Sequence, residues 1–470
     1  MPGIGALLSV ARTALQAQQA GVAVAGHNIA NAQTAGYSRQ TVNASARVAE
    51  LRPEGAVGTG VQVTGILRAR DRLLDAQLRQ SAAGASGSAA RRNLLQSVEG
   101  VLGAGGDAAL GSVLDQFYNA WNDLSSNPAS AASRANVRER GITLTNTLNN
   151  LANQVDTVAN TASESASALV ERVNSITTQI AQLNVQIVAG DAASGSANDL
   201  KDSRDRLIDE LATIVPLTAT EMPNGAGRVN VGGIALVDGA SAQSMSLLVG
   251  SSFQVSVAGS PDPMRFTDGT LGHTMQVMNS DLPAVRQSLD ALAAGIVRDV
   301  NALHVGGWSP TAGASGNWNP ALGPTGSGIN FFDPGATGLT ARGMSLSTQL
   351  LASPDAIAAG NALNAPGNNG IALGVADLRR AAPTASGGDY ATDIRRLVHL
   401  VAVKVSDADA DATVNETLRA QASERRNAAT AVSTDEELTN LMKYQQAYIA
   451  ASKLVSVADE LAQVVLGLIR

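Results

Sequence analysis

The stretch Asn28-Ile29-Ala30-Asn31-Ala32-Gln33-Thr34-Ala35-Gly36-Tyr37-Ser38-Arg39-Gln40 decides how the rest of the chain is interpreted. Asparagine disfavours the interior of a helix because its side chain hydrogen-bonds the nearby backbone. Gly36 supplies a position that turns freely. A helix that reaches this stretch from the N-terminus is therefore expected to end near residues 28–31.

The segment before this stretch has one apolar face. Small or apolar residues recur there at alternating intervals of four and three, with Gln18 filling the one gap. An average spacing of about 3.5 residues keeps one helical face against a partner helix. The residues of this face are Ile4, Leu8, Ala11, Leu15, Val22, Ala25 and Ile29.

The same spacing returns at the other end of the chain. A final helix is expected to begin at Thr434, where Thr434 and Glu437 have the spacing of a capping box. Its apolar face consists of Leu441, Tyr444, Tyr448, Ala451, Val455, Ala458, Ala462, Val465 and Ile469. The two end helices are therefore expected to form a coiled pair, with the interior of the chain as a body between them.

Composition excludes several classes of protein. The net charge of −7 argues against a nucleic-acid partner, which needs a basic face. No apolar run approaches the ~20 residues that span a bilayer, so membrane insertion is not expected. The absence of cysteine excludes thiol catalysis, cysteine-ligated zinc and disulfides. Gln16, Gln18 and Gln19 interrupt the apolar core that a cleaved leader would need.

The interior predicts a mainly α fold with a β insert. Helical patterns cover much of residues 68–214, and Asn127 with Pro128 is expected to start one of these helices. Composition shifts at Pro216, where Asn-Gly and Asp-Gly dipeptides separate β-like runs. The expected units are a terminal coiled-coil domain (1–45 and 432–470), a long-helix bundle body (46–215 and 274–431) with a long Gly-rich loop (305–345), and a small antiparallel β domain (216–273).

Details within these units can also be predicted. Extended segments are expected at residues 40–48 and 60–66, and separate helices end near 155, cover 170–187, begin at 282, and cover 394–405 and 412–430. The charged run at residues 198–211 is expected to expose its charges and bury its leucines. The aromatics Trp308, Trp318, Phe331 and Phe332 should hold the long loop against the body.

A search for catalytic or metal-binding chemistry finds little. The four histidines lie far apart in the sequence and lack partners at metal-ligand spacing. The run at residues 407–411 imitates the start of a calcium loop, but its sixth position is Ala412 and its twelfth is Leu418. No phosphate-binding or nucleophile-elbow motif occurs. We expect no enzyme activity, no catalytic residue, no cofactor and no metal.

The residues quoted above resemble the signatures of the axial proteins of the bacterial flagellum, the rod, hook and filament family. Residues 27–40 are similar to the signature at the end of the first helix, and residues 435–438 with 444–448 to its C-terminal counterpart. The terminal signatures mark the family as a whole, whereas interior stretches point to its members at the junction between hook and filament. These interior stretches are 119–124 with 127–128, 199–211, 300–304 with 331–332, and 354–360.

The resemblance implies a structural subunit of the flagellum. It implies export through the flagellar type III apparatus without cleavage, an extracellular location, and assembly into a ring or helical tier. The implied partners are the hook protein, a second junction protein, and an export chaperone that binds the C-terminal helix. The residues alone leave alternatives open: another axial component, a secreted adhesin or surface enzyme on the same scaffold, or an ordinary helical bundle. The apolar faces of the two end helices are mostly alanine, valine and glutamine, which bury little area. Such helices are marginal in water without a partner surface, so they favour an assembly role.

Overall fold

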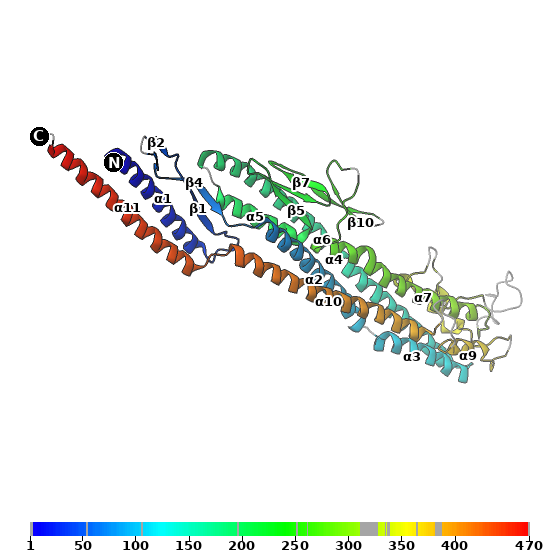
Figure 1. The fold of residues 1–470 in the computed structure, drawn as a ribbon. Helices are drawn as coiled ribbons and strands as arrows, with labels where there is room; N and C mark the ends of the chain where they lie inside the picture. Colours follow the sequence, from blue (N-terminus) through cyan, green and yellow to red (C-terminus); the bar gives the residue numbers. More distant parts are fainter. Residues whose placement is uncertain are drawn as a thin grey trace.

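The two ends of the chain lie side by side at one tip of an elongated molecule (Figure 1). In this computed structural model, α1 (Ile4–Asn31) runs from that tip toward the middle, and α11 (Thr434–Leu468) runs back to it. A long body of helices, with strands along one side, extends away from this pair. The structure describes residues 3–52, 55–104, 107–194, 197–250, 252–260, 262–310, 328–333, 335, 339–362, 365–380 and 388–468.

Two helices of the body are longer than the sequence predicted. The helix expected to end near residue 155 and the one expected at 170–187 are a single helix, α4 (Ala131–Ser194), of 64 residues. Residues 156–169 contain neither glycine nor proline, so nothing interrupts the helix there. Similarly, α10 (Tyr390–Thr430) joins the two helices expected at 394–405 and 412–430.

The start of α4 also differs from the prediction. Asn127 does not cap the helix, and the first helical residue is Ala131 instead of Pro128. Asn127 begins a turn in which its carbonyl accepts a hydrogen bond from the Ser130 N–H at 3.0 Å. The Ser130 hydroxyl then accepts from the Ser133 N–H at 3.2 Å, which is the usual role of a serine before a helix.

Strands lie in two places. β1 (Gln40–Ala46) pairs antiparallel with β4 (Val61–Arg68), which confirms the extended segments predicted on either side of residue 50. A separate two-stranded ribbon, β2 (Glu50–Arg52) with β3 (Gly55–Val57), lies between them in the sequence. The insert holds a four-stranded antiparallel sheet in the order β5-β6-β7-β8 and a hairpin of β9 and β10. Their bounds are β5 Leu217–Glu221, β6 Gly227–Val231, β7 Ile234–Asp238, β8 Ser241–Ala242, β9 Met245–Val249 and β10 Phe253–Val257.

Helical structure resumes earlier than predicted after the insert. α6 (Gly269–Gln276), a π-helical turn (Val277–Asp281) and α7 (Leu282–His304) follow one another without a break. His273, where the sequence placed the end of the insert, therefore lies inside α6. The remaining elements are α2 Arg72–Ala104, α3 Asp107–Ser126, α5 Asn198–Ile214, 3-10 turns Ala341–Gly343 and Pro354–Ala356, α8 Thr348–Ala352 and α9 Gly370–Asp377.

The body contains two hydrophobic clusters. The cluster far from the termini, between α3, α4 and α7, buries four aromatic side chains completely: Phe117, Trp121, Phe331 and Phe332. Two of them come from the long loop, as predicted, whereas Trp318 lies outside the described residues. The second cluster joins α4 and α5 to the sheet, so the strands share their core with the helical body. Among the described residues, α1 and α11 contribute to neither cluster.

Candidate functional site

The terminal helix pair, α1 with α11, is held by small side chains. The buried residues of α1 are Ala11, Ala17, Gly21, Val24, Ala25 and Asn28. On α11, Glu437, Ala451 and Ala458 are buried. Such residues bury little apolar area, so their contribution to stability is small compared with that of leucine or phenylalanine. The pair therefore brings two helices close together without forming a substantial core.

The predicted face of α1 is displaced by about one position. Ala11 and Ala25 are buried as expected, but the inward row continues through Gly21 and Asn28 in place of Val22 and Ile29. The Tyr444 ring of α11 explains this register. A Cβ atom on Gly21 would lie 2.5 Å from Cδ1 of that ring, so only glycine fits beneath it. The half-buried members of the predicted faces are Ile4, Leu15, Val22, Ile29, Leu441, Tyr444, Val455 and Ala462.

Three residues assigned to the seams are exposed instead. Leu8 is 39% exposed, Tyr448 36% and Val465 46%, because the inward row of each helix passes through smaller residues such as Ala11 and Ala451. Ile469 lies outside the described residues. On the C-terminal side, the inward row is carried by Ala451, Ala458 and their half-buried neighbours.

Large apolar side chains cover the outside of α11. Contiguous exposed apolar surface on a soluble protein commonly marks an interaction site. Eight such residues follow the helix along most of its length, and we call this surface the open face of α11. They are Leu438, Met442, Ile449, Leu454, Val457, Leu461, Val464 and Val465, each between 42% and 60% exposed.

A buried asparagine connects the end of α1 to both neighbouring segments. The Asn28 Nδ2 group donates hydrogen bonds to the Gln40 carbonyl at 2.8 Å and to Glu437 Oε2 at 3.0 Å. Its Oδ1 accepts from the Tyr37 hydroxyl at 2.8 Å and the Gln40 N–H at 2.9 Å. Only an amide side chain supplies two donors and an acceptor at one point. We call the polar contacts centred on Asn28, Arg39, Glu437 and Asp202 the joint.

Glu437 belongs to the joint and not to a helix cap. Its carboxylate accepts from Arg39 Nε at 2.8 Å, and its side chain is only 4% exposed. The predicted capping box with Thr434 is therefore wrong. Thr434 is the first residue of α11, and the Ser433 hydroxyl accepts from the Glu436 N–H at 3.4 Å. A partly buried guanidinium partner holds the carboxylate more strongly than an exposed backbone amide would.

The joint also reaches α5 in the body. The Ser38 hydroxyl and N–H donate to the two oxygens of Asp202, at 2.6 and 3.1 Å. Gln40 Nε2 donates to Asp199 Oδ1 at 3.1 Å. Arg68 Nη1 bridges Asp202 and Asp205, at 2.8 Å from each. Together these contacts fix residues 32–40 between the terminal pair and the body.

Charges are buried on α5, contrary to the expectation that they would be solvated. Asp202, Arg204 and Asp205 are each less than 10% exposed. Burial alone would raise the pKa of Asp205, but the guanidinium groups of Arg70 and Arg68 outweigh it and hold that pKa below its usual value. Asp199, Asp202 and Asp205 recur every three residues, which places them on one helical face. That spacing was the available signal for this part of the joint.

Tyr37 and Gly36 complete the joint. Burial, with the nearby carboxylates of Asp199 and Asp202, raises the pKa of Tyr37, so its phenol remains protonated and donates to Asn28. Gly36 has a φ of +79°, and a Cβ atom there would lie 2.2 Å from Cγ of Arg206 on α5. Glycine is therefore required for the loop to lie on α5. Asn31 lies at the edge, where its Nδ2 donates to the His27 carbonyl at 3.0 Å.

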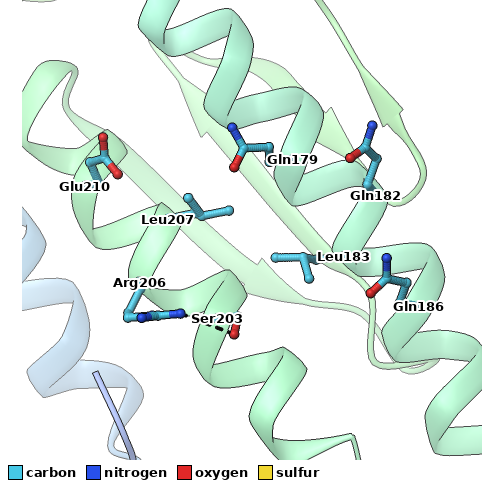
Figure 2. A pocket seen from close by; sticks show the side chains of 8 residues that line it. All are labelled: Gln179, Gln182, Leu183, Gln186, Ser203, Arg206, Leu207 and Glu210. Atoms are coloured by element: carbon cyan, nitrogen blue, oxygen red, sulfur yellow. Dashed lines mark hydrogen bonds between the residues drawn. The ribbon is translucent and has the colours of Figure 1, made fainter. Parts of the chain in front are cut away.

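A groove of about 510 Å³ lies next to the joint, between α4 and α5. Figure 2 shows Leu183 and Leu207 between the two helices, with glutamine side chains along α4 and Arg206 hydrogen-bonded to Ser203. The amide groups of the wall can bind a backbone or another amide. Among the described residues there is no cluster of three metal-ligating side chains. The described helices also include none with the length and hydropathy to cross a bilayer.

Comparison with known families gives matches along most of the chain. Residues 95–317 match the family described as "Flagellar hook-associated protein FlgK helical domain". Residues 8–37 match "Flagella basal body rod protein", and residues 427–468 match "Flagellar basal body rod FlgEFG protein C-terminal". The two terminal matches cover most of α1 and α11, and the interior match begins in α2.

Individual relatives agree with these families. Flagellar hook-associated protein 1 of Bacillus subtilis is 27% identical, over 98% of this chain and 97% of that protein. The Escherichia coli protein of the same name is also 27% identical, over 66% of this chain and 59% of its own length. The solved structure of the flagellar hook junction protein FlgK from Burkholderia pseudomallei shares the fold, with a TM-score of 0.62 at 15% identity. That match covers 75% of this chain and 99% of the solved one.

Proposed function

The chain belongs to the family of flagellar hook-associated protein 1, and we propose that it joins hook to filament as a structural subunit whose terminal helix pair is completed by neighbouring copies. The observation that carries this proposal is the open face of α11. Its eight large apolar residues lie outside a pair whose own seam is mostly alanine and glycine. Packing between copies would cover this surface.

Identical subunits would assemble through the open face of α11 on one copy and a different surface on the next. A contact between different patches on successive copies repeats without closing on two subunits, and so builds a ring or helical tier. The joint is suited to hold the pair at a fixed angle to the body, because Asn28, Arg39 and Glu437 connect three separate segments. We therefore propose the predicted division into a terminal domain (1–45 and 432–470), a helical body (46–215 and 274–431) and an insert (216–273).

The finer partners are part of the same proposal. The hook protein and a second junction protein would contact the tier on its two sides. An export chaperone would bind the open face of α11 before assembly, in the manner of an amphipathic helix in a groove. Export through the flagellar type III apparatus without cleavage would place the protein outside the cell. No catalytic role is proposed for any residue.

The test compares two exposed apolar residues. Ile449 on the open face of α11 is 56% exposed, and Val185 on α4 is 55% exposed. In a strain that lacks the native gene, Ile449→Asp should give bare hooks, with filament protein lost to the medium. Val185→Asp, the matched control, should restore filaments. Deletion of residues 438–470 should also give bare hooks while leaving a soluble helical body. Normal filaments with Ile449→Asp and with the deletion would contradict the proposal.

A further inference from the structure

A buried arginine lines a pocket at the start of α4. Arg134 is only 4% exposed, and the pocket that it lines has a volume of about 270 Å³. The wall of this pocket also includes Trp308, Gly360 and Asn368. Asn368 lies just before α9, at the end of the molecule far from the two termini (Figure 1). We call this site the Arg134 pocket.

The guanidinium of Arg134 has no ion pair among the residues that the structure describes. Its only hydrogen bond to them runs from Nε to the Ile357 carbonyl, at 3.2 Å. Burial lowers the pKa of Arg134 and outweighs the opposing effect of the Asp355 carboxylate, which lies beyond ion-pair distance. A buried charge without a close partner is costly. The two Nη groups of Arg134 are therefore available to bind an anion.

Other groups at the pocket donate hydrogen bonds as well. Oδ1 of Asn368 accepts from the N–H groups of Asn361 and Gly370, at 2.9 and 3.1 Å, whereas its Nδ2 has no partner among the described residues. The indole of Trp308 can only donate. Arg134 also belongs to the first turn of α4, the positive end of the helix dipole. These features suit a ligand that is negative and accepts hydrogen bonds.

The charge and size of the pocket indicate which anion it takes. A guanidinium fork matches the two oxygens of a carboxylate. One cation neutralises one carboxylate, whereas a phosphate group with nearly two charges would leave an excess near Asp355. The volume is below the ~300–1,000 Å³ of sites that enclose a whole small molecule. The pocket therefore fits one acidic side chain of a larger partner.

We propose that the Arg134 pocket binds an aspartate or glutamate side chain of a neighbouring protein in the flagellar axis. The carboxylate accepts hydrogen bonds from the Nη groups of Arg134 and from Nδ2 of Asn368, and its stem lies against Trp308. This inference rests on the proposed role at the junction, which supplies the neighbouring protein. It adds a contact that is separate from the open face of α11, since the pocket lies at the other end of the molecule.

Binding can be measured on the free full-length protein. The probe is N-acetylglutamate N-methylamide, a glutamate without chain-end charges, and the control is the corresponding glutamine compound. The indole N–H signal of Trp308, identified by its loss in Trp308→Phe, should shift with the glutamate probe only. Arg134→Met should weaken binding at least about tenfold, as expected when a charged hydrogen-bonded pair is lost. No shift with the glutamate probe, or equal shifts with both compounds, would overturn the inference.

A second variant fills the pocket from within the chain. Asn368→Asp keeps the accepting oxygen and replaces the free amide group by a second carboxylate oxygen. It should abolish binding of the glutamate probe without lowering the Tm. Asn153→Asp makes the same change on an exposed part of α4 and should leave binding intact. Full binding by Asn368→Asp would count against the proposed ligand position.

The neighbouring protein can be identified in isolated hook–filament structures that carry Arg134→Lys. A carbodiimide joins the introduced amine to a carboxylate in contact with it, and mass spectrometry identifies the linked residue. The expected partner is an aspartate or glutamate of another chain. Linkage only to Asp355 of the same chain, or no linkage in intact structures, would overturn the inference and leave the junction role standing. Absence of the native chain from such structures would instead contradict the proposed function, and probe binding would still decide whether the pocket takes a carboxylate.

Discussion

The body and the terminal pair are both helical, but they bury side chains of opposite size. In the body, large side chains are buried: Phe117, Trp121 and Phe331 are all 0% exposed. In the terminal pair, small residues are buried and large ones are exposed, with Ile449 and Val464 at 56% and 60%. Both regions have similar helical periodicity. The difference lies in which size of side chain faces inward.

Because of this difference, the body can provide the stability of the fold, whereas the terminal pair can provide surfaces for assembly. Burying a large apolar side chain stabilises a fold by about 1.5–3 kcal/mol, whereas alanine contributes much less. The body can therefore be stable in a single molecule. The terminal pair relies on the joint, where Asn28, Arg39 and Glu437 hold it by polar contacts, and on surfaces supplied by other copies. Four predictions test this contrast, beginning with the largest expected effect.

Removal of one aromatic ring from the body should be severe. Phe331 lies 4.8–5.6 Å, centroid to centroid, from four neighbouring rings. Phe331→Ala should lower the free energy of unfolding by about 3–5 kcal/mol, because it leaves a cavity in the core. Urea denaturation of the full chain measures this. A loss below about 1 kcal/mol would show that the body is not packed as described.

Acid should weaken the body through His304. Its Nδ1 lies 2.7 Å from the Ile329 carbonyl and its Nε2 accepts from the Ala358 N–H, so the buried ring is neutral. Burial lowers the pKa of His304 to about 4, against the opposing effect of the Ile329 carbonyl. The unfolded chain, with a pKa of 6.5, binds the proton first, so stability falls as the pH drops from 6.5 toward 4.

The expected loss from His304 is about 2 kcal/mol between pH 7 and pH 5. His304→Gln removes the titration while keeping a donor and an acceptor. The stability advantage of the native protein over this variant should therefore shrink by that amount across the same range, as measured by denaturation at each pH. A pH-independent difference between the two proteins would rule out this role.

The joint should respond to the loss of one charge. Glu437→Gln weakens the contact with Arg39 and should cost about 1–2 kcal/mol, because the partner guanidinium is partly buried. Hydrogen exchange in α1 and the first turns of α11 reports the effect. Glu436→Gln is the matched control, since its carboxylate is 64% exposed and 3.4 Å from the same arginine. Equal effects from both variants would show that the buried Glu437–Arg39 contact does not stabilise the terminal pair.

The smallest effect on stability should come from the open face of α11. Ile449→Ala should change the free energy of unfolding of the monomer by less than about 0.5 kcal/mol, because the side chain is already more than half exposed. The same variant should reduce the yield of assembled junctions, counted by electron microscopy. A large loss of monomer stability would mean that the Ile449 side chain packs within its own chain, and would contradict the contrast between the body and the terminal pair.

Much of this contrast could be predicted from the sequence. The end of α1 near Asn31 and the start of α11 at Thr434 follow from local residue preferences. The register of the pair did not follow, because alanine, valine and glycine differ too little in size to identify the inward row. That row depends on the contact between Tyr444 and Gly21, which are far apart in the sequence.

The joint was only half predicted. Its residues from Asn28 to Gln40 were recognised, but their partners on α5 were not. Charged residues are usually solvated, so the local sequence predicts that Asp202 and Asp205 lie on the surface. The burial of these two carboxylates depends on Arg68, which lies at the end of strand β4. Pairing across such distances leaves little trace in local periodicity.

The unbroken length of α4 has a mechanical consequence. A helix of 64 residues extends roughly 96 Å at ~1.5 Å per residue, and it packs in both hydrophobic clusters. Bending it in the middle would require breaking several backbone hydrogen bonds at once, so the body acts as a stiff beam. The terminal pair meets this beam through residues 32–39, which the joint holds on α5. A load applied to the terminal pair would therefore pass into the rigid body with little bending at the connection.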